Sequence, residues 1–418
     1  MLVVITTKAY LSPHPSMDAR SLVYWLGDRN RRQLLGAVDR QVVGTVALRL
    51  PDAARSGPTI HEALSQYGLG VTLDGEAWRN QLPVGHPLRD HRWRALGYDA
   101  TGRSRNPNRR LATPDERHDL VIPYLQAQLA GRATTLISPG HYSREPVGTA
   151  RRNDLAMAAD CAERMGRLGL RRARGTTPRR ALLANLTIDS TALNPAVIRW
   201  LVGAYTELLA DDDGPDGVWV WISNFNTSTV RFDQMRDLGL QLQENTAKPV
   251  VVGGLGHLWA AALTNGLAGV CAGPGRSTLN LLPREPKPVD PDSDNKDEIR
   301  RRTHVFHGAV IHSFAHSERG RTREAQSFRR FGCRCGHHPE NEPPQGEHDR
   351  VLHNAWEAMQ AARRAASLSP QIATDRLNDR LARVERRREQ IGLKPLPPAW
   401  RRAAGARERP GQAQGRAL

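Results

Sequence analysis

The most specific chemical signal in the sequence is a Cys-x-Cys-x2-His arrangement formed by Cys333, Cys335 and His338. Thiolate sulfur and imidazole nitrogen are the ligands that zinc prefers in structural sites. Three such residues on one tight turn supply three corners of a tetrahedron, and a fourth ligand from a nearby helix ties that helix to the turn. The sequence therefore predicts a structural zinc site. The alternative interpretation is a pair of unpaired surface thiols beside incidental histidines.

The fourth zinc ligand is expected on a helix predicted at 349–366. Its apolar side carries Val351, Leu352, Ala355, Trp356 and Met359. His353 lies in the first turns of this helix, and we favour it as the fourth ligand. His348, in the glycine-containing approach to the helix, and His337 are the alternatives.

A second group of polar residues and glycines follows short apolar runs earlier in the chain. Its members are Asp74, His141, Asn185, Asp189, Asn224, Gly253, Gly254, His257 and Arg276. Barrel enzymes keep their chemistry at the carboxyl ends of their strands, so these residues predict a polar substrate pocket. The Gly253-Gly254 pair would let a ligand approach backbone amides, and Arg276 could hold a phosphate. Each residue type is also common in turns and caps, so the prediction depends on their coincidence at successive strand ends.

Four further histidines, His304, His307, His312 and His316, are close together in the sequence. The spacing of the last two would place them on one side of a helix, and Glu318 is the only acidic residue close by. We interpret the group as core or surface histidines and not as a second metal site.

The elements that position these residues alternate between apolar runs and helix-length segments. The expected strands are 70–74, 133–138, 181–189, 217–224, 249–254 and 269–273, with 305–312 as a further candidate. The expected helices between and after them are 153–168, 194–209, 229–245, 257–265, 349–366 and 374–391. This βα rhythm without a Gly-x-Gly-x-x-Gly fingerprint favours a (β/α)8 barrel over an open doubly wound sheet.

Composition shifts divide the chain into four predicted parts. Residues 1–65 form an N-terminal segment, 66–330 the (β/α)8 barrel-like domain, 331–392 a zinc-binding helical module and 393–418 a disordered tail. No run of 18 apolar residues is present, which predicts no membrane span. The four cysteines form no disulfide framework, which favours a reducing, cytoplasmic compartment.

The net charge of +17 comes from 55 arginines and only 5 lysines. Arginine suits phosphates and base edges, so a nucleic-acid partner, tRNA or DNA, is one interpretation. A solvated surface with a codon bias from a GC-rich genome is the other. If nucleic acid binds, the polar stretch 102–117 is the expected contact, through Arg103, Arg105, Arg109 and Arg110.

The chain from Asp74 to His353 resembles the tRNA-guanine transglycosylase-like barrels, which exchange guanine for a deazaguanine in tRNA or DNA. That family joins a (β/α)8 barrel to a Cys-x-Cys-x2-Cys module followed by a histidine on a helix. Cys333 and Cys335 match its first two ligands, and His338 stands at the third. Gly253-Gly254-Leu255 resembles its base-recognition loop, and Asp74 resembles its first catalytic aspartate.

The resemblance implies a base-exchange reaction at the barrel mouth. Asp74 would bind or deprotonate the base, and Asp189 would attack the sugar to form a covalent intermediate. The alternatives are a non-catalytic nucleic-acid-binding or assembly module on the same barrel, and an unrelated barrel hydrolase.

Overall fold

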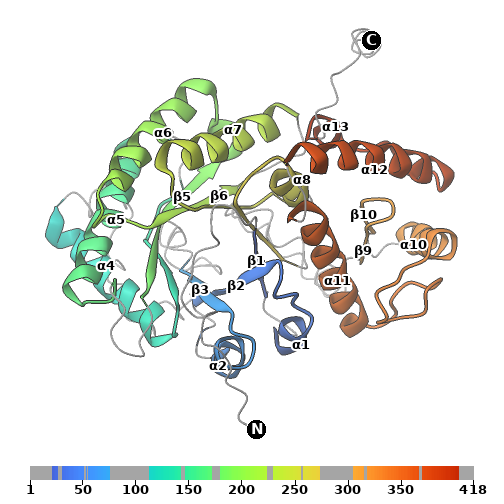
Figure 1. Cartoon of the computed structure of the whole chain (residues 1–418), viewed down its shortest axis with the longest axis horizontal. Coiled ribbons are helices and arrows are strands. Elements are labelled where there is room, and N and C mark those ends of the chain that lie inside the picture. The colour runs from blue at the N-terminus through green and yellow to red at the C-terminus, as the bar shows by residue number, and fades with distance from the viewer. Residues whose placement is uncertain are drawn as a thin grey trace, which may run out of the picture.

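The protein folds into a closed barrel of eight parallel strands (Figure 1). The computed structural model describes residues 21–26, 31–50, 53, 55–75, 113–142, 146–171, 179–223, 229–255, 258–273, 305–314, 318–366 and 370–403. The barrel strands are β1 (Ser21–Trp25), β2 (Val43–Arg49), β3 (Gly70–Asp74), β4 (Thr135–Ile137), β5 (Ala181–Asp189), β6 (Gly217–Ser223), β7 (Val250–Gly253) and β8 (Gly269–Ala272). Each strand pairs in parallel with the next, and β8 pairs with β1. The predicted α/β barrel is confirmed.

Alternate residues of each strand face the barrel interior, because side chains of a strand alternate between its two faces. On β5, Leu182 and Ala184 belong to the large core that packs under the helices, whereas Leu183 belongs to a separate interior cluster. That cluster consists of Val23, Trp25, Ala47, Ile137, Leu183, Trp219, Trp221, Val251 and Cys271. The same alternation directs Asn185, Thr187 and Asp189 to the interior.

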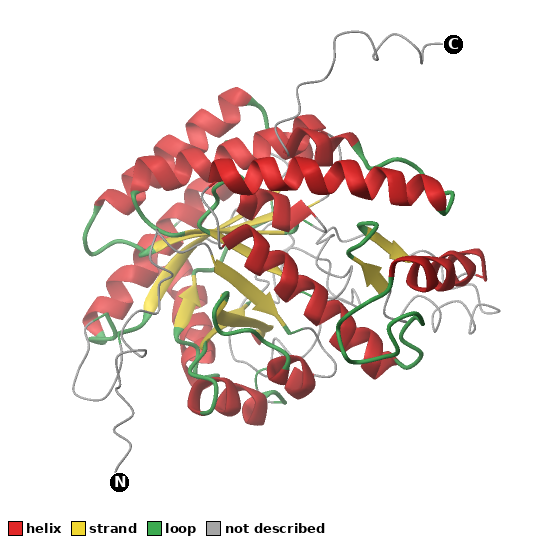
Figure 2. Cartoon of the chain, turned by 45° about the vertical axis from the view of Figure 1, so that its right-hand side comes forward, coloured by secondary structure: helices red, strands yellow, loops and turns green. Residues whose placement is uncertain are grey.

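Helices cover the outside of the barrel (Figures 1 and 2). They are α1 (Arg31–Gly36), α2 (Gly57–Ser65), α4 (Pro114–Ala130), α5 (Thr149–Arg167), α6 (Pro195–Ala210), α7 (Thr229–Thr246) and α8 (Trp259–Thr264). The start of α6 illustrates how sequence sets these bounds: the Asn194 side chain accepts hydrogen bonds from the Ala196 and Val197 amides, and proline occupies the first helical position.

The described part of the C-terminal region contains the antiparallel pair β9 (Val305–His307) and β10 (His312–Phe314) and four helices. These are α10 (Glu318–Phe331), α11 (Glu347–Ala366), α12 (Pro370–Gln390) and α13 (Pro398–Ala403). Helix α11 packs against α8, α1 and β1, in the gap between the last and first helices of the ring (Figure 1). Arg363 of α11 forms an ion pair with Asp39, which precedes β2. The helix of the predicted zinc module therefore also completes the wall of the barrel.

The structure corrects the predicted boundary at residue 65. Strands β1 and β2 lie within 1–65 and are the first two strands of the barrel itself. The apolar stretch 41–50 contains β2, and β1 was not predicted, because a five-residue run gives almost no periodic signal.

Two further predictions are wrong. The candidate barrel strand 305–312 is instead β9 and the start of β10, joined by a turn in which the Val310 amide bonds to the His307 carbonyl. The first part of the predicted disordered tail, 393–403, is ordered. Leu396, Ala399 and Trp400 are buried there, because α13 packs against α7 and α8.

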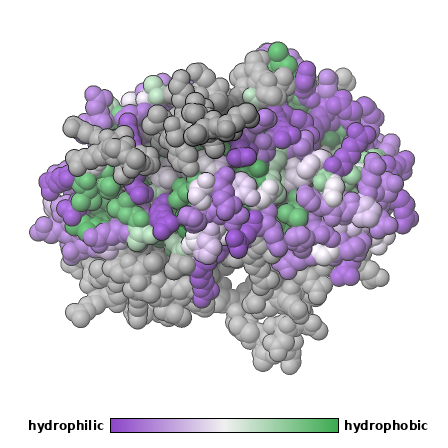
Figure 3. All heavy atoms as spheres, turned by 60° about the horizontal axis from the view of Figure 1, so that its bottom comes forward, coloured by the Kyte–Doolittle hydropathy of each residue, from purple (hydrophilic) through white to green (hydrophobic). Residues whose placement is uncertain are grey.

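Hydrophilic side chains dominate the described surface on the face shown in Figure 3, and apolar ones gather only in small patches. Among the described helices, none combines the length and the apolar character needed to cross a bilayer.

Candidate metal centre and barrel mouth

The four predicted zinc ligands converge in the structure. The ligand atoms of Cys333, Cys335, His338 and His353 all lie within 4.8 Å of one another. The two cysteines stand on the turn that follows α10, where Gly332 has a φ of 64°. That left-handed conformation favours glycine and lets the chain turn back sharply toward α11.

Each histidine of the cluster directs one nitrogen inward and bonds the other to a carbonyl. His353 Nε2 lies 2.7 Å from the Phe306 carbonyl oxygen, and His338 Nδ1 lies 2.9 Å from that of Pro339. Donation from these nitrogens leaves His353 Nδ1 and His338 Nε2 as lone-pair atoms 3.1 Å apart. Outer hydrogen bonds that fix the tautomer are the usual companions of metal-binding histidines. The donor set therefore fits a metal ion.

The two thiols share a hydrogen bond that favours the thiolate form of one of them, Cys335. A hydrogen bond from Cys333 holds the pKa of Cys335 well below its usual range, and the same bond together with burial raises the pKa of Cys333. The His337 amide donates to Cys335 Sγ at 3.4 Å. Two sulfurs and two imidazole nitrogens form a set typical of tetrahedral sites. His348 is exposed, and neither it nor the His337 side chain belongs to the cluster.

The rings of Phe328 and His307 pack beside the Cys/His cluster. Phe328 stacks on His307 with ring centroids 4.2 Å apart and presents its ring to His338 and His353. Burial lowers the pKa of His307 to about 4, so this imidazole is neutral. It bonds to Ser327 Oγ and to the Gly332 carbonyl, which confirms it as a core histidine. His304 and His316 lie outside the described residues.

At the barrel mouth, Asp74 and Asp189 end β3 and β5. Asp189 shares the interior face of β5 with Leu183. Thr72 pairs in register with the interior residue Ala47, so Asp74, two positions on, also faces inward. Both carboxylates are buried. The structure thus brings the two candidate catalytic residues to the same rim.

Asp189 accepts hydrogen bonds on both oxygens. Oδ1 receives the Thr191 amide at 2.8 Å and the Thr191 hydroxyl at 2.7 Å. Oδ2 receives the Tyr142 hydroxyl at 2.5 Å. The first of these bonds caps the short 3-10 turn Ser190–Ala192. These hydrogen bonds from Thr191 and Tyr142 fix the orientation of the carboxylate.

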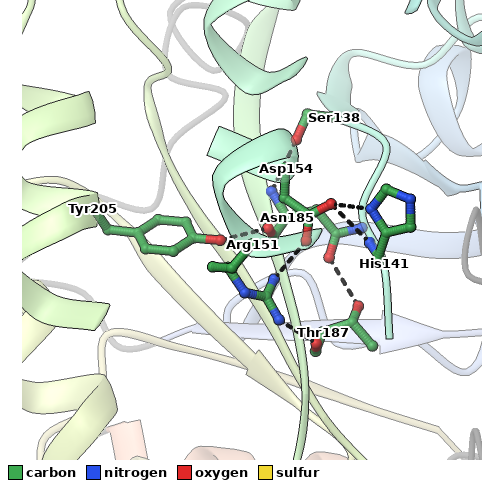
Figure 4. Close-up of polar contacts among 7 residues, drawn as sticks. All are labelled: Ser138, His141, Arg151, Asp154, Asn185, Thr187 and Tyr205. Atoms are coloured by element: carbon green, nitrogen blue, oxygen red, sulfur yellow. Dashed lines mark hydrogen bonds and ion pairs between the residues drawn. The ribbon is translucent and has the colours of Figure 1, made fainter. Parts of the chain in front are cut away.

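His141 belongs to a second buried network on the same side of the barrel (Figure 4). Its Nδ1 lies 2.5 Å from Asp154 Oδ1, and Asp154 Oδ2 accepts from Arg151 Nη1 at 2.8 Å. Arg151 Nη2 in turn donates to the Thr187 carbonyl of β5 at 2.7 Å. The side chains of Arg151 and Asp154 are fully buried. This network fixes His141 relative to both α5 and β5.

Asn185 is held on the interior face of β5. Its Oδ1 accepts from the Thr187 hydroxyl at 2.9 Å, and its backbone carbonyl accepts from the Tyr205 hydroxyl at 2.7 Å (Figure 4). Its backbone amide donates to Ser138 Oγ, which ties β5 to the loop that carries His141.

Packing explains the Gly253-Gly254 pair without a ligand. A Cβ on Gly253 would come within 2.5 Å of the Trp221 ring. Gly254 has a φ of 83°, and a Cβ there would overlap the Ile222 carbonyl oxygen. Trp221 also lies 5.7 Å from Trp25 across the interior, centroid to centroid. These indoles fill the barrel beneath the mouth.

Several predicted site residues lie outside the described residues. They are Asn224, His257, Arg276, Arg103, Arg105, Arg109 and Arg110.

Arg151 and Asp154 were not predicted as site residues, because their spacing of three is typical of a solvated helical ion pair. The signal that could have found them is their place on the buried stripe of α5, in line with Ala158, Cys161 and Met165. Charged residues that continue an apolar stripe must be paired, because an isolated buried charge is costly.

The chain matches no protein-family model and no curated protein sequence.

Proposed function

We propose that the protein acts on nucleic acid as a base-exchanging transglycosylase, replacing guanine in tRNA or DNA. The observation that carries this proposal is the pair of buried, interior-facing carboxylates, Asp74 and Asp189, on one rim of a closed barrel. The resemblance to the tRNA-guanine transglycosylases supports it, because the Cys/His cluster follows the barrel in the same order as that family's zinc module. The net charge of +17 suits a polyanionic partner.

In the proposed reaction, an Asp189 oxygen attacks the anomeric carbon of the nucleotide. The bond from that carbon to the base nitrogen breaks, and the base departs with the electron pair and takes up a proton. An incoming base then loses a proton, displaces Asp189 and restores the glycosidic bond. A covalent ester is needed because it holds the sugar while one base replaces another. Asp74 would bind the base edge, and the Gly253 and Gly254 backbone would lie beside it.

The nucleophile is assigned to β5 because β8 offers none among the described residues. The interior positions of β8 are Gly269 and Cys271, and Gly273 follows its end. Burial, with a further contribution from the nearby Asp74 charge, raises the pKa of Cys271. This thiol therefore remains protonated and is a poor nucleophile.

We further propose that the cluster of Cys333, Cys335, His338 and His353 holds a structural zinc ion. The metal would fasten the turn after α10 to α11, and it takes no part in the reaction. All four protein ligands are present, which is typical of closed structural sites, whereas a catalytic zinc keeps a position open.

The second candidate function is a non-catalytic nucleic-acid-binding or assembly module. The observation that favours it is the hydrogen bonding of Asp189, whose oxygens serve as a cap for Thr191 and an acceptor for Tyr142. A carboxylate with this many donors is a weaker nucleophile.

Incorporation of labelled guanine into tRNA and into duplex DNA tests the proposal. Asp74→Asn and Asp189→Asn should each abolish incorporation while nucleic-acid binding persists, because the amide keeps the shape and removes the charge. The matched control is Asp216→Asn, which alters a buried carboxylate beside the start of β5, at the opposite end of the barrel. Wild-type protein that binds nucleic acid and exchanges no base would leave the non-catalytic module as the correct account.

A further inference from the structure

The ring of His141 is held by a carboxylate that is itself locked in place. Asp154 Oδ1 accepts the His141 backbone amide at 3.0 Å, and Oδ2 accepts Arg151 Nη1 at 2.8 Å. The Asp154 side chain has no exposed area. Both oxygens of Asp154 therefore accept hydrogen bonds from groups that can only donate, a backbone amide and a guanidinium.

The hydrogen bond to Asp154 decides which nitrogen of His141 carries the proton. A carboxylate only accepts hydrogen bonds, so the Nδ1 atom 2.5 Å from Asp154 Oδ1 must be the donor. Neutral His141 therefore has its lone pair on Nε2. Within the described part of the chain, Nε2 makes no hydrogen bond, and Figure 4 shows the ring edge that carries it directed away from Asp154.

The imidazole of His141 lies on a segment that reaches the rim of the barrel near Asp189. It lies in the segment that follows β4, and the next residue, Tyr142, donates its hydroxyl to Asp189 at 2.5 Å. Arg151 anchors the network to β5 through the Thr187 carbonyl, two residues before Asp189. A purely structural ion pair between α5 and β5 would need Arg151 and Asp154 but not a histidine fixed in one tautomer.

We propose that His141 is the proton-transfer residue of the barrel mouth, with Asp154 and Arg151 as its positioning residues. This role rests on the proposed base exchange. Protonated His141 gives the Nε2 proton to the departing base as that base leaves with the bond electrons. Neutral Nε2 then takes the proton that the incoming base loses as its nitrogen bonds to the anomeric carbon. One proton leaves and one returns, and Asp154 balances the imidazolium charge.

Two measurements test the positioning without any enzymatic assay. In full-length protein labelled with 15N-histidine, the neutral His141 ring should be the Nδ1–H tautomer by long-range 1H–15N NMR. Diethyl pyrocarbonate should carbethoxylate His141 at Nε2, as located by peptide mass spectrometry, with exposed His348 as the internal reference. Asp154→Asn should lose the tautomer preference and reduce the reaction at His141 at least about tenfold.

The matched control is Asp160→Asn. Asp160 lies on the same helix, and its Oδ2 pairs with Arg117 Nε at 2.7 Å, so the control also removes an aspartate–arginine pair. It should leave the His141 tautomer and reactivity unchanged. An Nε2–H tautomer in the wild type, or a His141 that does not react while His348 does, would overturn the proposal.

The exchange assay separates this proposal from the proposed function. His141→Gln should lower kcat about 100-fold or more with KM changed less than about threefold, since general acid–base catalysis contributes factors of this size. Asp154→Asn should lower kcat about tenfold or more, and Asp154→Glu should recover part of it. Full activity in His141→Gln refutes the proton-transfer role and leaves the transglycosylase intact. A wild type without exchange refutes the transglycosylase, and the NMR and labelling results then decide the positioning alone.

Discussion

The Nδ1 atom of His353 lies 3.4 Å from the Sγ atom of Cys333, although 20 positions separate the two residues in the sequence. His353 belongs to α11, the helix that also fills the gap between α8 and α1 in the wall of the barrel. Helix α11 therefore connects the cluster directly to the barrel. A metal bound there would stabilise the barrel as well as the C-terminal region.

Removal of the two cysteines should abolish metal binding and destabilise the whole chain. We expect about one zinc per chain by elemental analysis of protein purified without a histidine tag, and none in Cys333→Ser with Cys335→Ser. Zinc binding contributes folding free energy directly, so the melting temperature should fall by about 10 °C or more in the double variant. Chelation of the wild type should have the same effect.

The control for the cysteine experiment is Cys161→Ser with Cys271→Ser. These two cysteines are buried in the barrel, far in sequence from the cluster. That variant should lose stability through packing and keep its zinc. Stoichiometric zinc in the Cys333/Cys335 double variant would show that the cluster is not the metal site.

His353→Ala and His348→Ala form a matched pair of histidine deletions on one helix. His353 is fully buried and belongs to the cluster, whereas His348 is exposed on the first turn of α11. We expect His353→Ala to lower zinc affinity at least about 100-fold, because three ligands remain, and His348→Ala to leave it unchanged. Competition with a chromogenic chelator measures both. Equal affinity of the two variants would be inconsistent with the assignment of His353.

The sequence predicted those elements and site residues whose structure depends on neighbouring residues in the chain. The run Ala181–Asp189 is mostly apolar, as is typical of a strand buried on both faces, and it forms β5 over the same residues. The Asn194-Pro195 pair predicts a helix start from local interactions alone: the Asn194 side chain caps the first amides, and the proline ring fits the first helical position. The cysteine spacing likewise predicted three residues of the metal cluster.

Sequence alone was uninformative where meaning depends on distant neighbours. Arg151 and Asp154 look like any helical ion pair in the sequence. Only the packing of α5 against β5 buries them and makes Asp154 the hydrogen-bond partner of His141. Gly253 looks like a ligand-binding glycine, yet Trp221, from the adjacent strand, requires it. The gap that α11 fills could not be predicted, because the ring of helices exists only once the barrel has closed.

Substitution of the paired glycines should destabilise the barrel. Gly254→Ala forces a Cβ into the Ile222 carbonyl at a φ of 83°, which should cost about 2 kcal/mol or more. Gly253→Ala should push Trp221 aside at a cost of about 1–3 kcal/mol. Urea unfolding at equilibrium measures both changes in the free energy of unfolding.

Gly203→Ala is the control for the glycine series. Gly203 lies in α6, and a Cβ there would meet no atom within 4 Å. Alanine should stabilise the chain by about 0.5–1 kcal/mol, since glycine is the poorer helix former. Unchanged stability in Gly254→Ala would mean that the loop after β7 relaxes at no cost.

Nucleic-acid binding should weaken steeply with salt, because each neutralised phosphate releases counterions. We expect a variant with all four of Arg103, Arg105, Arg109 and Arg110 replaced by glutamine to bind duplex DNA with a weaker salt dependence. The slope of log affinity against log salt should decrease by about 3–4, close to one phosphate per arginine. Titrations of tRNA and duplex DNA between about 50 and 200 mM salt measure this slope.

The matched control removes the same charge elsewhere, with Gln at four exposed arginines of α10, Arg319, Arg321, Arg329 and Arg330. If the polar stretch 102–117 makes the phosphate contacts, the α10 variant keeps most of the wild-type slope, because exposed charges beyond a Debye length are screened. An equal loss of slope in both variants would contradict a contact localised to 102–117. Absence of any complex at low salt would leave codon bias as the explanation of the +17 charge.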